Sequence, residues 1–246
     1  MAVFDCHTVV EGYALDGVAN TLEQLNSFLK DAGVNQALVA SRRAMWADPV
    51  AGNRILNAML EHAEGLYGCV VAHLNRVEDS VIAIRDLLGS RRFLAVALQP
   101  AHPGEPLPVL VADEVLNACR RFQKPILVPT ADARGVEVAL QLAKQYSMHR
   151  FVFLGMGGAD WRSAIAAAHQ SVNITLETSG PMDRAKVPAA VAALGSHRIL
   201  FGSGAPDCDP AAALGLLTDS EISETDMRRI VHDNAARLFN LGGASD

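Results

Sequence analysis

Short hydrophobic runs alternate with longer amphipathic stretches along the whole chain. The runs are rich in Val, Ile, Leu and Phe and are almost continuously apolar, which is typical of parallel strands covered by helices. We expect strands at residues 2–10, 36–41, 66–74, 93–100, 125–130, 150–157, 172–179 and 198–204. Their starts lie about 22 to 34 residues apart, which is the length of one strand–helix unit.

The stretches between these runs have the periodicity and the end signals of helices. Residues 20–23 have the spacing of a capping box before an apolar stripe, and residues 223–239 form a final amphipathic stretch. Eight such repeats without a change in composition predict an α/β protein, a single (β/α)8 TIM barrel that forms one domain over residues 1–246. An open doubly wound sheet is the alternative, although the glycine-rich dinucleotide fingerprint of that fold is missing.

Composition narrows the class of protein further. Half of the residues are hydrophobic, and the net charge of −6 argues against a nucleic-acid partner. We find neither an apolar run long enough to span a membrane nor a secretory signal, so we expect a cytoplasmic, reduced protein. Cys69 and Cys119 are expected to be buried thiols, whereas a disulfide or a nucleophile at Cys6 and Cys208 stays open. Whether the protein forms a homo-oligomer also stays open.

Several segments, in order along the chain, resemble the amidohydrolase-related family. They are residues 4–9, 124–130, 151–158, 173–180 and 198–206, followed by a closing helix at 230–239. This family contains metal-dependent amidohydrolases and carboxylate decarboxylases on a (β/α)8 barrel. The resemblance therefore implies a hydrolase-type barrel whose small-molecule site lies at the carboxyl ends of the strands.

The resemblance also implies a metal site, typically for zinc, and most of its ligands are missing here. Of the family's first histidine pair only His7 remains, because Val9 stands at the partner position. The fifth strand ends in Thr130 without a histidine, and Gly155 and Gly204 stand at the sixth and eighth strand positions. A catalytic zinc needs about three protein ligands. We therefore expect a degenerate site that holds no metal cofactor.

The remaining candidates for catalysis are Asp5, His7 and Glu177. Side chains alternate along a strand, so Asp5 and His7 are expected on one face, where the carboxylate would orient the imidazole as a general base. The alternative is that Asp5 is structural and His7 a relic. Glu177 could act as an acid or base if a dry cavity raised its pKa, or it could pair with an arginine on a neighbouring strand.

Four further residues are candidates for binding a substrate. Arg42 and Arg43 follow the second strand and could grip a carboxylate or phosphate, unless they are solvated. His73 could join His7 and an acidic side chain in a new metal site, or it could cap a loop. Thr130 ends the fifth strand and is expected to line the pocket. The glycines of residues 155–158 indicate a tight turn, with phosphate binding as the alternative.

Two classes of function follow from these residues. In the first, the protein is an enzyme that uses acid–base chemistry on a small carboxylate-bearing substrate, by hydrolysis or ring opening. In the second, it is a non-catalytic barrel that binds a ligand or pairs with an active subunit. A coherent polar constellation around His7 would separate the two classes, and the sequence offers only scattered candidates for it.

Overall fold

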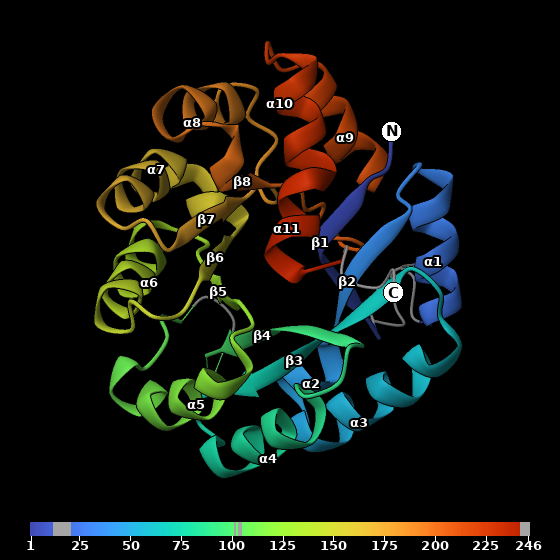
Figure 1. Ribbon diagram of the computed structural model, residues 1–246, viewed down its shortest axis with the longest axis vertical. Helices are drawn as coiled ribbons and strands as arrows, with labels where there is room; N and C mark the ends of the chain where they lie inside the picture. The colour runs from blue at the N-terminus through green and yellow to red at the C-terminus, as the bar shows by residue number, and fades with distance from the viewer. Residues whose placement is uncertain (12–20, 101, 103–104, 242–246) are drawn as a thin grey trace.

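The chain folds into a ring of helices around a barrel of strands, as Figure 1 shows. The structure, a computed structural model, describes residues 1–11, 21–100, 102 and 105–241. The elements follow one another around the barrel in chain order, so each strand lies beside the strands that come before and after it.

Eight parallel strands form one sheet in the order β1 to β8. Their bounds are β1 Phe4–Val10, β2 Gln36–Ser41, β3 Leu66–His73, β4 Phe93–Gln99, β5 Ile126–Pro129, β6 Phe151–Leu154, β7 Ile174–Glu177 and β8 Ile199–Leu200. Every strand lies inside a range expected from the hydrophobic runs. The prediction of a single (β/α)8 barrel is confirmed.

Backbone hydrogen bonds between β1 and the segment that starts with β8 close the barrel. The Cys6 N–H donates to the Phe201 carbonyl at 2.9 Å, and the Gly204 N–H donates to the His7 carbonyl at 2.9 Å. On its other side, β1 pairs with β2, and the register of this pairing shifts between Asp5 and Thr8. Such a shift breaks the strict alternation of side chains, and it falls in the segment that carries the candidate residues.

Helices follow the strands and cover the outside of the barrel. Their bounds are α1 Leu22–Asp31, α2 Arg42–Trp46, α3 Pro49–Met59, α4 Val77–Leu87, α5 Ala112–Cys119, α6 Ala133–Gln145, α7 Trp161–Gln170, α8 Lys186–Leu194, α9 Pro210–Thr218, α10 Glu224–Arg228 and α11 Asn234–Phe239. In the described part, none of them is both long and apolar enough to cross a membrane.

Polar caps fix where several helices begin. Thr21 and Gln24 form the capping box of α1, with the Thr21 hydroxyl accepting from the Gln24 N–H at 3.1 Å. This box lies one residue later than the Asn20–Glu23 pair that we expected, and Asn20 lies outside the described residues. Asp209 caps α9, and its side chain accepts from the Ala211 N–H at 2.8 Å.

Two apolar layers hold the sheet. The outer layer packs the strands against the helices, and the inner layer fills the barrel with side chains that include Phe4, Leu38, Cys69 and Val152. Phe239 of α11 closes the amino-terminal end, because its ring stacks on Phe4 with the ring centroids 5.4 Å apart. In Figure 1, α11 lies in front of the strands, so the view is from this end.

The four cysteines are free thiols, which excludes the disulfide between Cys6 and Cys208. Cys6, Cys69 and Cys119 are buried. Burial raises the pKa of Cys6 well above its ordinary value, because a thiolate loses its hydration inside the barrel. Burial and the raised pKa both disfavour a nucleophilic role for Cys6.

Candidate functional site

A buried carboxylate stands at the carboxyl end of β7. Glu177 is fully buried, and one of its oxygens, Oε1, accepts from the Ser179 N–H at 2.6 Å. The other, Oε2, accepts from the Ser179 hydroxyl at 2.7 Å and from the Gly155 N–H at 2.9 Å. Burial by itself would raise the pKa of Glu177, but the contact with His7 and these donors outweigh burial and lower it. The carboxylate is therefore charged at neutral pH.

The glycine turn after β6 serves this carboxylate. Residues 155–158 all have positive φ, with Gly155 at +75°, and this turn points the Gly155 N–H at Glu177. The segment is thus a tight turn, as expected, and its backbone donor is used inside the protein.

The imidazole of His7 lies against Glu177 and Ser179. Its Nδ1 is 2.9 Å from the Ser179 hydroxyl oxygen and 3.4 Å from Glu177 Oε2. Because the Ser179 hydroxyl donates its proton to Glu177, Nδ1 must carry a proton and donate it to that hydroxyl oxygen. Proton exchange is then left to Nε2, which makes no hydrogen bond within the described residues.

The charge of Glu177 changes the acidity of this imidazole. Burial lowers the pKa of His7, but the contact with Glu177 and its negative charge outweigh burial, so that the pKa is raised above the ordinary 6.5. The positively charged imidazolium is therefore more populated near neutral pH than in an ordinary histidine.

Asp5 makes no hydrogen bond to the imidazole, and its contacts match the alternative in which it is structural. Its carboxylate accepts from the backbone N–H of His7 at 3.0 Å, and from the N–H and hydroxyl of Ser203 at 3.0 and 2.5 Å. The carboxylate is used by these backbone and hydroxyl donors, although its negative charge still contributes to raising the pKa of His7. Burial, the largest cause, raises the pKa of Asp5 to about 6.

The two arginines after β2 are paired with carboxylates of the protein. Arg42 Nη2 lies 2.6 and 2.7 Å from the two carboxylate oxygens of Asp207, and Arg43 Nε lies 3.4 Å from Glu11. An external anion at Arg42 would compete with Asp207. Both arginines are thus at the mouth, and neither is simply solvated.

Two further candidates have local structural tasks. Thr130 is fully buried, and its hydroxyl donates to the Leu154 carbonyl at 2.8 Å and accepts from the Gly157 N–H at 3.2 Å. With its side chain buried and its hydroxyl engaged on both sides, the contacts of Thr130 do not support the expectation that it binds substrate. His73 ends β3, and its Nδ1 accepts from the Asn75 N–H at 3.3 Å. This contact matches the alternative in which His73 caps a loop.

Two polar residues near Glu177 were not predicted from the sequence. Ser179 bonds both Glu177 and His7, and the spacing of two residues from Glu177 at a strand end was the available signal. Lys186 in the first turn of α8 is buried, and its Nζ donates to the carbonyls of Thr178 and Ser179 at 2.6 and 3.0 Å. Burial lowers the pKa of Lys186. Nothing in the sequence marks this helix-start lysine as a core residue.

A cleft of about 170 Å³ opens at the same end of the barrel, above β4 and β5. Trp46 from α2 and Pro129 from β5 give it apolar walls, and Gln99, Glu105 and Arg134 give it polar groups. It offers space for a small ring beside the strand ends.

The positions at which the resemblance implies metal ligands do not fit a metal. Val9, Gly155 and Gly204 have no ligating side chain, and Gly204 has a φ of +79°, which disfavours the aspartate of the family. Among the described residues, no group of three or more His, Cys, Asp or Glu side chains could hold a metal ion.

Solved structures of decarboxylases share this fold. The chain superimposes on 2,6-dihydroxybenzoate decarboxylase from Rhizobium with a TM-score of 0.78 and 14% identity, over 99% of this chain and 100% of that one. For dihydroxybenzoic acid decarboxylase from Polaromonas sp. JS666, solved with manganese and 2-nitroresorcinol, the TM-score is 0.77 and the identity 14%, over 99% of this chain and 98% of that one. For 5-carboxyvanillate decarboxylase from Novosphingobium aromaticivorans, solved with manganese and 4-hydroxy-3-methoxy-5-nitrobenzoic acid, the TM-score is 0.79 and the identity 12%, over 97% of this chain and 96% of that one.

These structures overturn the expectation of a protein without a metal cofactor. Two of them contain manganese, so this fold does bind a metal, and missing ligand positions alone do not make a member of it metal-free. They also carry the names of decarboxylases, where we had expected hydrolysis.

The comparison of sequences supports the resemblance found along the chain. No curated protein matches the sequence. The family model described as amidohydrolase matches residues 4–241. The match spans nearly the whole chain and includes every strand of the barrel, and the protein therefore belongs to the amidohydrolase family.

Proposed function

We propose that the carboxyl end of the barrel binds a small aromatic carboxylate and that His7 exchanges a proton with it. The observation that carries the proposal is the arrangement of Glu177 and His7. Nδ1 is engaged by Ser179 and Glu177, at 2.9 and 3.4 Å, which leaves Nε2 for a ligand. A carboxylate behind an imidazole fixes its tautomer and stabilises its charged form, as general acids and bases require.

The charge of this pair suits an anionic ligand. Because the pKa of His7 is raised, its imidazolium attracts a carboxylate near neutral pH, and Nε2–H can donate a proton. Glu177 stays charged behind it and is itself held by two backbone N–H groups and one hydroxyl, so the pair needs little reorganisation when the proton moves.

The reaction that we propose is decarboxylation. The bond between the ring carbon and the carboxylate carbon breaks, carbon dioxide leaves, and the electron pair stays on the ring carbon. That carbon takes the proton from Nε2 of His7, and the neutral imidazole later regains a proton from water. An aromatic substrate is supported by the cleft with Trp46 and Pro129, and by relatives that act on 2,6-dihydroxybenzoate and 5-carboxyvanillate.

A second function, binding without turnover, is supported by different contacts. Arg42 and Arg43 already pair with Asp207 and Glu11, and the Thr130 hydroxyl is used inside the protein. A barrel of this kind could hold a carboxylate at His7 as a ligand-binding subunit and leave the bond intact.

One experiment separates the two functions. The purified protein is incubated with 2,6-dihydroxybenzoate, once with added manganese and once with a chelator, and proton NMR follows both ligand binding and the appearance of the ring that has lost its carboxylate. The variants are His7→Gln and Glu177→Gln. The matched control is His169→Gln, because His169 is exposed on α7 and outside the pair.

Turnover by the wild type that falls by about 10²-fold or more in His7→Gln and persists in His169→Gln supports the enzyme. Binding without turnover that is lost in His7→Gln supports the ligand-binding barrel. Equal turnover or equal binding in the wild type and His7→Gln would overturn the role of His7. A wild type that neither binds nor converts the compound under either condition would overturn the substrate class.

A further inference from the structure

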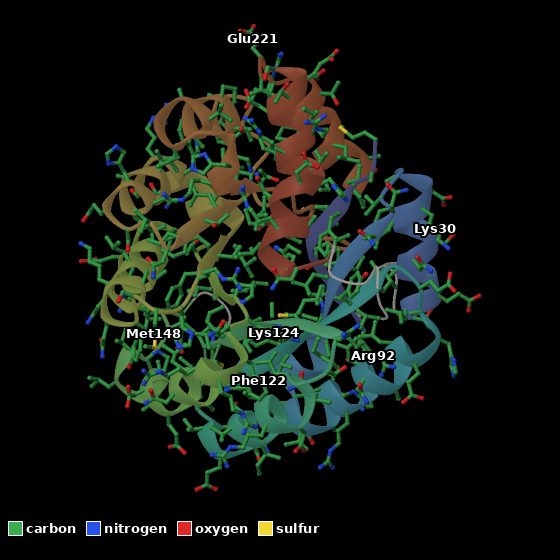
Figure 2. The ribbon with its side chains drawn as sticks, in the orientation of Figure 1. Lys30, Arg92, Phe122, Lys124, Met148 and Glu221 are labelled. Atoms are coloured by element: carbon green, nitrogen blue, oxygen red, sulfur yellow. The ribbon has the colours of Figure 1, made fainter. Side chains whose placement is uncertain are left out.

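A second groove opens at the opposite, amino-terminal end of the barrel. It has a volume of about 560 Å³ and lies between the short helix η3 (Arg120–Phe122), the starts of β5 and β6, and the end of α11. Lys124 and Met148 from its lining are labelled in Figure 2, on the face that the viewer sees. The polar side chains of the lining are those of Arg120, Gln123, Lys124, His149, Arg150 and Asn240.

The lining has positive charge and no negative charge. Arg120, Lys124 and Arg150 contribute three cations, and neither Asp nor Glu lines the groove. Across the part of the chain that the structure describes, none of these three forms an ion pair. Burial lowers the pKa of Lys124 and of Arg150, as happens when cations lose hydration without gaining a counter-charge. The protein as a whole is acidic, with a net charge of −6, so this concentration of charge is local.

Backbone carbonyls hold two of the cations in place. Lys124 Nζ donates to two carbonyls, one of them that of Ser90 at 2.7 Å, and an ammonium has three N–H groups, so one is left. Arg150 Nη2 donates to the Gln123 carbonyl at 2.7 Å. Charges that are fixed before a ligand arrives lose little side-chain entropy when it binds.

Other donors at the groove have no internal task. Arg120 is exposed, and within the described residues its guanidinium makes no hydrogen bond. The same holds, over the described residues, for the side-chain amides of Gln123 and Asn240. Several N–H donors of this kind can surround the oxygens of a tetrahedral anion.

We propose that this groove binds a small phosphorylated molecule whose phosphate lies among Arg120, Lys124 and Arg150. A phosphate monoester has a charge of about −1.5 to −2 and three acceptor oxygens, so it matches three cations better than a single carboxylate does. A groove of about 560 Å³ is within the size range of small-molecule sites. This site is independent of His7 and Glu177, which lie at the other end of the barrel.

Calorimetric titration with inorganic phosphate at pH 8 and constant ionic strength tests the proposal, with acetate as the comparison anion. The variant is Arg120→Gln, whose exposed side chain makes no internal bond that folding needs. The matched control is Arg121→Gln, which removes the same charge from the same short helix. Arg121 does not line the groove and lies over the ring of Phe122, at 4.5 Å from its centroid.

We expect saturable phosphate binding by the wild type and by Arg121→Gln, and about tenfold weaker binding by Arg120→Gln, since a charge-assisted hydrogen bond is lost. Acetate should bind more weakly than phosphate to the wild type. If phosphate binding weakened equally in both variants, the effect would come from general charge attraction, and the proposed phosphate site would be overturned. Binding that does not saturate, or acetate binding as tight as phosphate binding, would overturn it as well.

Discussion

The contact between Gly202 and Glu177 allows a sharp test of the buried pair. In Gly202→Ala the new Cβ would lie 2.0 Å from Oε1 and 2.6 Å from Cδ of Glu177, so the carboxylate must retreat by about 1 Å or more to reach ordinary contact. Gly202 does not have a positive φ, so the backbone itself accepts alanine. The substitution therefore acts through the displaced carboxylate.

The expected cost follows from the bonds that hold Glu177. Its oxygens accept from the Ser179 N–H, the Ser179 hydroxyl and the Gly155 N–H, and a retreat stretches or breaks these bonds. Losing one or two hydrogen bonds to a charged group costs about 2–5 kcal/mol. For a chain of this size, a loss of about 3 kcal/mol lowers the Tm by roughly 6–12 °C.

Urea unfolding of the wild type and the variant measures this cost, and NMR titration of His7 gives a second result. With Glu177 displaced, the pKa of His7 should fall toward its ordinary value, because the negative charge that raises it has moved away. Gly215→Ala is the matched control. Nothing lies within 4 Å of a Cβ there, and alanine inside α9 should stabilise the protein by about 0.5–1 kcal/mol. If Gly202→Ala unfolds within about 0.5 kcal/mol of the wild type and leaves the His7 pKa unchanged, the packing of Glu177 described above is wrong.

Two further perturbations act on the same pair. Glu177 has a lowered pKa, so its contribution to the stability of the fold is present above its ordinary pKa of 4.5 and is lost as the pH falls through the lowered value. His7 has a raised pKa, so its contribution is present below its ordinary pKa of 6.5 and is lost as the pH rises through the raised value. Urea unfolding of Glu177→Gln against the wild type should therefore show the largest difference between about pH 4.5 and 6.5, and a difference that grows outside this window would contradict the pairing. Lys186→Met removes the donor to the Thr178 and Ser179 carbonyls and should destabilise the protein by about 1–3 kcal/mol in urea, while a stabilised variant would indicate that desolvating the ammonium costs more than its two bonds contribute.

The architecture could be predicted from the sequence because its signals are local. Each strand appears as an apolar run, and the eight runs contain the eight strands. Where a helix start was predicted, the structure places it within about one residue, as with Thr21 in place of Asn20. His7 was singled out by the family resemblance, as what remains of a histidine pair, and Glu177 by its place at the end of a strand.

The tertiary structure decided which of these residues meet. The Asp5 carboxylate bonds Ser203 rather than the imidazole, and Glu177 became the partner of His7 with Ser179 between them. Apolar periodicity depends on neighbours a few positions apart, so a sequence displays it directly. A hydrogen bond between β1 and β7 depends on strand register and on the turns around the barrel, and no stretch of sequence contains both ends of it.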